Sequence, residues 1–224
     1  MAARLSIVIP VLNEAPRIAA ALERLAPLRG RGHEVLVVDG GSDDASAALA
    51  APLCDRLLRA SPGRATQLNA GARAARHEQL VFLHADTELP RDADRLIAAA
   101  LERRRWGRFD AEIEGRHPAL PLIAAAMNLR SRLTGIATGD QAIFVRRADF
   151  PGFPEIPLME DVALSRVLRR RGPPACLRCR VRTSGRRWES RGVLRTVVLM
   201  WWLRVLYAFG VAPERLARFY GDAC

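Results

Sequence analysis

Short apolar runs alternate with helical segments along the first 90 residues, and this alternation constrains the fold more than any other feature of the chain. Four runs have the length and the β-favouring composition of buried strands, namely residues 4–11, 34–39, 56–60 and 80–83. Helical segments follow the first and third runs at 14–25 and 65–76. Strands joined through helices form right-handed crossovers, so the pattern predicts an α/β fold: a mostly parallel, doubly wound sheet with helices on both faces.

The second half of the chain lacks this regular alternation. Helices are expected at 91–105, 118–133 and 162–171, and strands at 109–114 and 139–147. With 224 residues, the chain fits one domain with a sizeable core. We therefore expect a single domain over 1–224, composed of a first half at 1–90, a second half at 91–190 and C-terminal helices at 191–224.

The net charge and the cysteines indicate the kind of partner and the cellular compartment to expect, but they do not identify a partner. A formal net charge of +11 attracts anions, whether they are nucleotide phosphates, nucleic acid or an anionic membrane surface. Cys176 and Cys179 form a C-x-x-C, but no second pair stands at zinc-ribbon spacing, so we interpret both as structural. No secretory signal precedes the first strand, and the expected compartment is the cytosol with reduced thiols.

Residues 193–211 form the most apolar segment. Arg195 and Arg204 interrupt it, and its uncharged core at 196–203 is far shorter than the roughly 20 residues of a membrane span. Two interpretations remain open. The segment is either a helix packed on its own domain or on a second subunit of a homodimer, or an interfacial helix with its tryptophans at an anionic membrane surface, on the inner face of the membrane.

Polar side chains follow each of the four strands predicted in the first half. They are Asn13 and Glu14, Asp39, Arg64, and His84 with Asp86. Because the carboxyl ends of parallel strands meet at one edge of a sheet, these side chains should converge there. Carboxylates suit ribose hydroxyls, the N–H of a base and hard divalent cations that carry a diphosphate. The G-x-G-x-x-G and P-loop signatures are absent, which disfavours a Rossmann dehydrogenase and a P-loop kinase.

Five segments in order along the chain resemble the motifs of family 2 glycosyltransferases of the GT-A fold. They are IVIPVLNE (7–14), VVDGGSDD (37–44), GRATQLNAGARAA (63–75), LHADT (83–87) and MED (159–161). A sixth, SGRRW (184–188), resembles the Q-x-x-R-W of processive members. The resemblance implies a Rossmann-like sheet that binds a nucleotide-sugar donor in its first half and the acceptor in its second. It also implies an inverting transfer of one sugar to an acceptor hydroxyl, assisted by a divalent cation, Mn²⁺ or Mg²⁺.

The same resemblance assigns roles to individual residues. Asp161 takes the place of the general base, with Glu160 and Arg187 beside it as catalytic residues, and Asp86 is the expected metal ligand. The substrate-binding residues are expected to be Pro10, Asn13, Glu14, Asp39, Arg64, Asn69, His84, Asp140 and Trp188. UDP is the default nucleotide because it is the commonest in the family. The acceptor is left open, with a lipid-linked molecule as one candidate, and no nucleic acid partner is expected.

Three residues depart from the family pattern. Gly40 replaces the second aspartate of D-D-G, which leaves Asp39 to contact the nucleotide. His84 replaces the first aspartate of D-x-D, so it either contacts the nucleotide or joins the metal shell, where an imidazole would favour Mn²⁺. Ser184 replaces the glutamine of Q-x-x-R-W, which weakens the analogy with processive synthases.

Two other functions compete with sugar transfer. The altered D-x-D and D-D-G motifs are compatible with a non-catalytic module that binds a nucleotide sugar or a membrane. A sugar nucleotidyltransferase shares the architecture, but it requires a glycine-rich, basic signature after the first strand. The segment PVLNEAPR (10–17) has no such signature.

Overall fold

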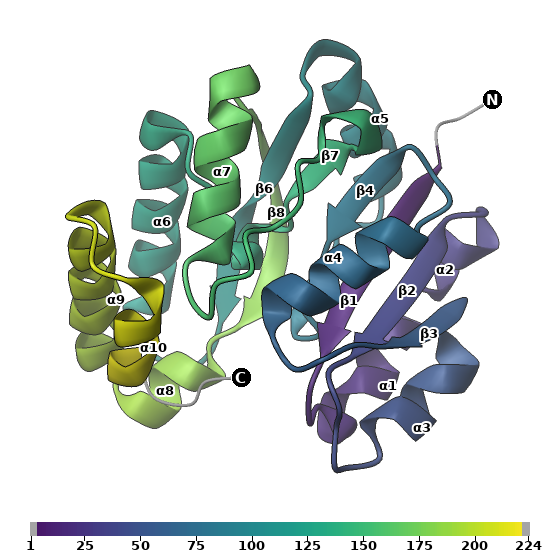
Figure 1. Cartoon of the computed structure of the whole chain (residues 1–224), viewed down its shortest axis with the longest axis horizontal. Coiled ribbons are helices and arrows are strands. Elements are labelled where there is room, and N and C mark those ends of the chain that lie inside the picture. Colours follow the sequence, from purple (N-terminus) through teal and green to yellow (C-terminus); the bar gives the residue numbers. More distant parts are fainter. Residues whose placement is uncertain (1–3, 221–224) are drawn as a thin grey trace.

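An eight-stranded sheet runs through the computed structural model, which describes residues 4–220 except the side chains of Arg187 and Arg191. The strands lie in the order β3-β2-β1-β4-β7-β6-β8-β5 (Figure 1). Their bounds are β1 (Leu5–Val11), β2 (Glu34–Asp39), β3 (Arg56–Arg59), β4 (Gln79–Phe82), β5 (Thr87–Glu88), β6 (Trp106–Glu114), β7 (Phe144–Arg146) and β8 (Ala175–Ser184).

The first four strands of this order form a parallel unit, as the alternation in the sequence predicts. β1 pairs in parallel with β2 and β4, and β2 with β3. Strand β7 is antiparallel to β4 and β6, β6 is parallel to β8, and β5 is antiparallel to β8. The regular βα connections end at β4, which explains why the second half of the sequence shows no such rhythm.

Helices cover both faces of the sheet. They are α1 (Ala15–Glu23), α2 (Ala26–Gly30), α3 (Ser46–Ala50), α4 (Arg64–Ala74), α5 (Ala93–Arg103), α6 (Leu120–Thr134), α7 (Glu160–Arg171), α8 (Arg186–Arg191), α9 (Val193–Ala208) and α10 (Pro213–Tyr220). Alternate residues of β1 serve the two faces: Ile7 and Ile9 join the core with α1 and α5, while Val8 joins the core with α4 and α7. This is the period-2 alternation of a strand buried on both sides.

Among the places where the structure departs from the sequence-based expectation are residues 139–147 and the end of the first helix. Residues 139–147 do not form one strand, because Gly139–Gln141 is a 3₁₀ turn and only Phe144–Arg146 pairs in the sheet. Ala142 adopts a left-handed conformation with φ of 46°, which breaks the extended chain. The helix expected at 14–25 corresponds to α1, and an additional short helix, α2, follows it, with Pro27 in its first turn, where proline is tolerated.

The C-terminal helices contribute to a small core and also expose apolar side chains. Leu203 of α9 is fully buried with Leu216 of α10 and with Val162 of α7. On the same helix, the side chains of Trp201 and Trp202 are more than half exposed. Within residues 4–220 no helix is long and apolar enough to cross a membrane.

The close approach of α4 to β1 yields a test of the packing. A Cβ atom on Gly71 would lie 2.2 Å from Cγ1 of Val8, a buried residue of the central strand. Overpacking of a core costs about 1–3 kcal/mol, more than the roughly 1 kcal/mol that alanine gains over glycine in a helix. We expect Gly71→Ala to lower the free energy of unfolding by about 1–2 kcal/mol in urea titrations.

The matched control is Gly30→Ala at the end of α2. A Cβ atom there meets nothing within 4 Å, so stability should be unchanged or slightly higher. Equal effects of the two substitutions on stability would contradict the conclusion that Gly71 allows the close approach of α4 to β1.

Candidate active site

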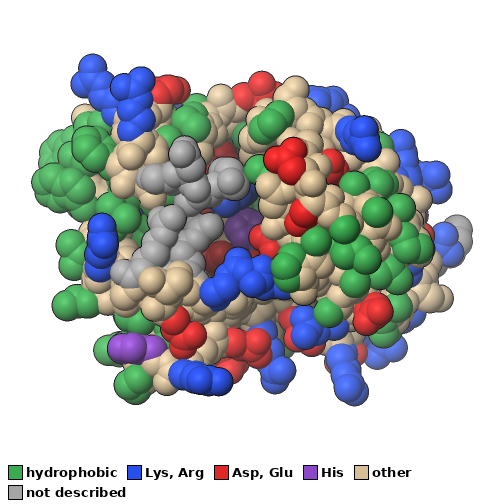
Figure 2. Space-filling view, turned by 90° about the horizontal axis from the view of Figure 1, so that it is seen from below, with side chains coloured by type: hydrophobic (Ala, Val, Ile, Leu, Met, Phe, Trp, Pro, Cys, Tyr) green, Lys and Arg blue, Asp and Glu red, His purple; other side chains and the backbone are tan. Residues whose placement is uncertain are grey.

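A cleft of about 490 Å³ opens at the carboxyl ends of β1, β4 and β8. The hollow is visible near the middle of the face shown in Figure 2. Side chains from α7, α8, α9 and α10 form its opposite wall. The cleft therefore lies outside the carboxyl ends of parallel strands, where open α/β sheets bind their ligands.

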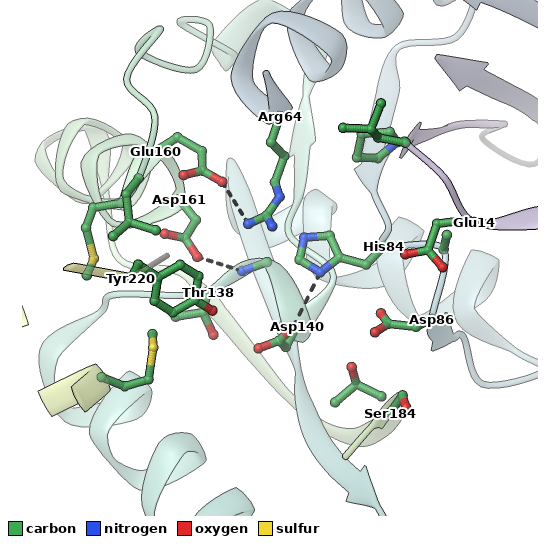
Figure 3. A pocket seen from close by; sticks show the side chains of 18 of the residues that line it. Glu14, Arg64, His84, Asp86, Thr138, Asp140, Glu160, Asp161, Ser184 and Tyr220 are labelled. Carbon is green, nitrogen blue, oxygen red and sulfur yellow. Dashed lines mark hydrogen bonds and ion pairs between the residues drawn. The ribbon is translucent and has the colours of Figure 1, made fainter. Parts of the chain in front are cut away.

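Ten of the residues predicted from the sequence line this cleft. They are Pro10, Asn13, Glu14, Arg64, His84, Asp86, Asp140, Glu160, Asp161 and Trp188. Figure 3 shows Glu14 and Asp86 on one side of the cleft and Glu160 and Asp161 on the other, with His84 between them. Residues more than 140 positions apart in the sequence thus face one space.

Three predicted residues do not line the cleft with a described side chain. Asp39 is only 2% exposed, and its carboxylate accepts hydrogen bonds from the hydroxyl of Ser42 at 2.5 Å and from the N–H of Gly41 at 3.3 Å. Asn69 is buried and exchanges two hydrogen bonds of 2.8 Å with the backbone of Phe153, so it fixes the loop before α7. The side chain of Arg187 lies outside the described residues.

Glu160 is a buried carboxylate at the start of α7. Met159 before it has φ of 70°, and this left-handed conformation turns the chain into the helix. The side chain of Glu160 pairs with Arg64, whose Nη1 lies 3.1 Å from Oε1 (Figure 3). Burial raises the pKa of Glu160, while the positive charge of Arg64 lowers it and the negative charge of Asp161 raises it further.

Asp161 is held by two backbone N–H groups. Its Oδ2 accepts a hydrogen bond of 2.9 Å from Gly139, and its Oδ1 accepts one of 2.7 Å from Val162. These bonds fix the orientation of the carboxylate, and each oxygen retains a second lone pair for another partner. A carboxylate held in this way can accept a proton from a hydroxyl group bound in the cleft.

His84 lies against the turn that carries Gly139 and Asp140. Its Nδ1 is 3.4 Å from Oδ1 of Asp140. A Cβ atom on Gly139 would lie only 2.3 Å from Nε2 of His84, so the position requires glycine. On the other side, the carbonyl oxygen of Asp86 accepts a hydrogen bond of 3.2 Å from the N–H of Ser184.

The donor atoms near Asp86 suit a hard cation only in part. No group of three or more histidine, cysteine, aspartate or glutamate side chains in the described part of the chain is arranged to hold a metal ion. The carboxylates of Asp86 and Asp140 both face the cleft, with the imidazole of His84 beside them. Carboxylate oxygens suit Mg²⁺ and Mn²⁺, and both ions usually complete their shell with water and phosphate oxygens. These residues therefore fit a cation that arrives with a diphosphate.

Gln67 is a site residue that the motif comparison missed. It is buried at the floor of the cleft, and its Nε2 donates to the carbonyl oxygens of Val11 at 2.9 Å and Val38 at 2.8 Å. It follows Arg64 by three positions on α4, a helical spacing that could have revealed it. A Cβ atom on Gly40 would lie 2.9 Å from Cδ of Gln67. The glycine that departs from the family pattern therefore leaves room for this amide.

Further residues of the cleft lie on the C-terminal helices and were also missed. Arg186, Thr196, Met200, Arg204 and Tyr220 contribute to the wall opposite the strands. The sequence shows them only as parts of an apolar, arginine-bearing segment. Their spacing on α9, at 196, 200 and 204, places three of them on one face of that helix.

The sheet has the GT-A fold of several solved glycosyltransferase structures. Residues 1–349 of S. aureus TarS align with a TM-score of 0.66 at 17% identity, over 81% of this chain and 60% of that one. A mannosyltransferase from Pyrobaculum calidifontis, in complex with GDP-Man and Mn²⁺, has a TM-score of 0.61 at 20% identity, over 81% of this chain and 57% of that one. Glucosyl-3-phosphoglycerate synthase from Mycobacterium tuberculosis, with Mg²⁺ and UDP, has a TM-score of 0.58 at 20% identity, over 81% and 70%.

The chain belongs to glycosyl transferase family 2, whose model matches residues 6–149. The resemblance seen in the sequence motifs is thereby confirmed, as are the GT-A fold and the class of enzyme. The chain spans about three fifths of the length of the first two solved structures named above. A search of curated proteins found no match.

The ion pair between Arg64 and Glu160 predicts that removing Arg64 destabilises the fold in a pH-dependent way. The pKa of Glu160 is raised in the folded protein, so stability falls as the pH rises from its unfolded pKa through its folded pKa. Arg64→Met removes the charge that opposes this shift. We expect it to lower the free energy of unfolding by about 1–2 kcal/mol at pH 8 and by much less below pH ~4.5, where Glu160 is protonated in both states.

Arg180→Met is the matched control, because Arg180 pairs with Glu112 at 3.7 Å on an exposed strand. Its effect should stay within about 0.5 kcal/mol. Adding Glu160→Gln to Arg64→Met should restore stability at pH 8, and a loss that is equal at both pH values would show that the ion pair is not the cause.

Proposed function

We propose that the chain transfers one sugar from a nucleotide-sugar donor, with UDP as the first nucleotide to test, to an acceptor hydroxyl with inversion at the anomeric carbon. The observation that carries the proposal is the carboxylate of Asp161, held by the N–H groups of Gly139 and Val162 and facing the same cleft as Glu14 and Asp86. TarS and the mannosyltransferase were solved with UDP-GlcNAc and GDP-Man, which supports a donor of this class.

The donor nucleoside is proposed to lie against the loop after β1. Pro10, Asn13 and Glu14 line that part of the cleft. Asp39 supports the loop through Ser42, whose hydroxyl oxygen accepts a hydrogen bond of 3.0 Å from the N–H of Asn13. The proposed role of Asp39 is therefore to position this loop. Asn69 likewise acts through the loop before α7.

Asp86 and Asp140 are the residues that would hold a divalent cation, with His84 beside them. Such a cation would neutralise charge that develops on the departing diphosphate. The M. tuberculosis synthase was solved with Mg²⁺ and with Mn²⁺, and the mannosyltransferase with Mn²⁺. The resemblance to Q-x-x-R-W makes Arg187 a proposed helper at the same diphosphate.

The proposed reaction is a single displacement. The acceptor oxygen forms a bond to the anomeric carbon, the bond from that carbon to the diphosphate oxygen breaks, and its electron pair leaves with the nucleoside diphosphate. Asp161 takes the proton of the acceptor hydroxyl. Glu160 is buried and paired to Arg64, so its proposed role is to position Arg64 and the first turn of α7.

Replacing Asp161 by Asn tests the base. The amide keeps the size of the side chain but cannot take the proton, so we expect the rate of transfer to fall by about 10²- to 10⁴-fold. Donor binding should change little. It can be followed by thermal shift with Mn²⁺, where a ligand at 100 times its dissociation constant stabilises the fold by about 2.7 kcal/mol. Asp92→Asn, at an exposed position before α5, is the control.

The products of the donor separate this function from the alternatives. Slow release of nucleoside diphosphate from a nucleotide sugar supports a transferase. Release of pyrophosphate from a sugar phosphate and a nucleoside triphosphate would identify a nucleotidyltransferase. Tight binding without turnover would identify a non-catalytic module, and a transfer rate for Asp161→Asn equal to that of the parent would exclude Asp161 as the base.

We also propose that an anionic membrane contacts the apolar surface formed by α6 and α9. The surface consists of exposed side chains of Leu122, Leu129, Leu133, Leu194, Val198, Trp201, Trp202, Val205 and Phe209. Hydrophobic side chains gather at this end of the molecule in Figure 2. Arg195 on α9 and Arg215 and Arg218 on α10 are exposed, and each arginine near an anionic surface contributes about 1 kcal/mol. A lipid-linked acceptor would reach the cleft from this side.

Sedimentation with anionic vesicles checks the membrane proposal. We expect the protein to pellet with them at low salt and to be released at high salt, because the arginines act through screened charges. Replacing both Trp201 and Trp202 by Ser should weaken the partitioning at least about tenfold, since two indoles leave the interface. Leu49→Ser, at an exposed position on α3, is the control. A stable dimer that stays in the supernatant would instead assign the surface to a second copy of the chain.

A further inference from the structure

Two arginines near Asp161 have buried guanidinium nitrogens without a hydrogen-bond partner. The atoms are Nε and Nη2 of Arg130 on α6 and Nε of Arg204 on α9, and none has a partner among the described residues. Nε of Arg108 is also buried without a hydrogen-bond partner, but the guanidinium of Arg108 is paired with Asp110. No ion pair joins Arg130 or Arg204 to a carboxylate of the described part of the chain.

Arg204 lines the cleft together with Asp161, and Arg130 lies behind this lining, within reach of the charges of both residues. Arg204 lines the cleft, one and two turns after Met200 and Thr196 on the same face of α9. The pKa of Arg130 is lowered to about 10, first by burial and next by the positive charge of Arg204. The negative charge of Asp161 acts on this pKa in the opposite direction, so Arg130 lies near both residues. Figure 1 shows α6 and α9 side by side at this end of the molecule.

A buried guanidinium without a partner destabilises a fold, and nearly all such groups in proteins are satisfied by some partner. Here one of them, Arg204, lines a cleft that a ligand can enter, and the other, Arg130, is its near neighbour. An anionic ligand would supply the acceptors that the protein itself does not. By contrast, the guanidinium of Arg64 is already paired with Glu160.

We propose that Arg130 and Arg204 bind a phosphate group of the acceptor, adjacent to the hydroxyl that Asp161 deprotonates. This inference rests on the proposed transfer of a sugar and adds the chemical class of the acceptor. Two guanidinium groups supply several N–H donors in a planar arrangement and two positive charges. They match a phosphate, which carries about −1.5 to −2 charges at pH 7, better than a carboxylate with one.

The experiment measures the binding of inorganic phosphate with the donor site filled. The full chain is first saturated with Mn²⁺ and UDP, or with whichever nucleoside diphosphate it binds, so that phosphate cannot occupy the diphosphate position. We expect Arg204→Met and Arg130→Met each to weaken phosphate binding at least about tenfold, because each removes charged hydrogen bonds. Arg170→Met removes the same charge from an exposed position near the end of α7 and should leave phosphate binding unchanged.

A second measurement separates binding from folding. Without phosphate, Arg130→Met should raise the Tm of the protein, because it removes a buried charge that lacks a partner. A structural arginine would give the opposite result, a lower Tm.

Three outcomes would overturn the inference: no phosphate binding in the parent, phosphate binding in both variants as tight as in the parent, or acetate binding as tightly as phosphate. Failure of the proposed function would look different, since the parent would then not bind any nucleoside diphosphate. The source of the phosphate group is determined by competition. Vesicles of phosphatidic acid that displace phosphate from the parent would indicate a lipid headgroup, and absence of displacement would indicate a soluble phosphorylated acceptor.

Discussion

The close contact between α4 and β1 is the constraint on which the cleft depends. Gly71 has no room for a Cβ atom against Val8, so the helix lies at a distance that other residues would not allow. At that distance the amide of Gln67 reaches the carbonyl oxygens of Val11 and Val38, where β1 and β2 end. The ends of the two strands are thereby held at a fixed separation, and the polar loops that follow them share one floor.

The same helix also connects the two halves of the domain. Arg64 in its first turn pairs with Glu160, and Asn69 binds the backbone of Phe153 in the loop before α7. These contacts join positions 84 and 96 residues apart. Because Asp161 follows Glu160 directly, the placement of the proposed base relative to the strand ends is determined by α4 rather than by the sheet alone.

The sequence predicts the sheet of the first half well because each strand there is buried on both faces and flanked by turn residues. The strand at 34–39 has the predicted bounds, and most of the acidic motif residues do face one cleft. The pattern is less informative where a role depends on tertiary distance. Asp39 and Asn69 match family motifs but bond to neighbouring loops. Gln67 lies inside a matched segment without an assigned role, and Arg204 faces the cleft outside every motif.

In the proposed reaction, the donor and the acceptor would meet different charged groups of the cleft. A nucleoside diphosphate near Asp86 and Asp140 would meet two carboxylates, so its binding there requires a cation between the like charges. Near Asp161, Arg130 and Arg204 supply positive charge, and neither forms an ion pair with a described carboxylate. A phosphate group bound there would need no metal ion. Both substrates could then carry phosphate and still be directed to different parts of one cleft, the donor by its cation and the acceptor by arginine.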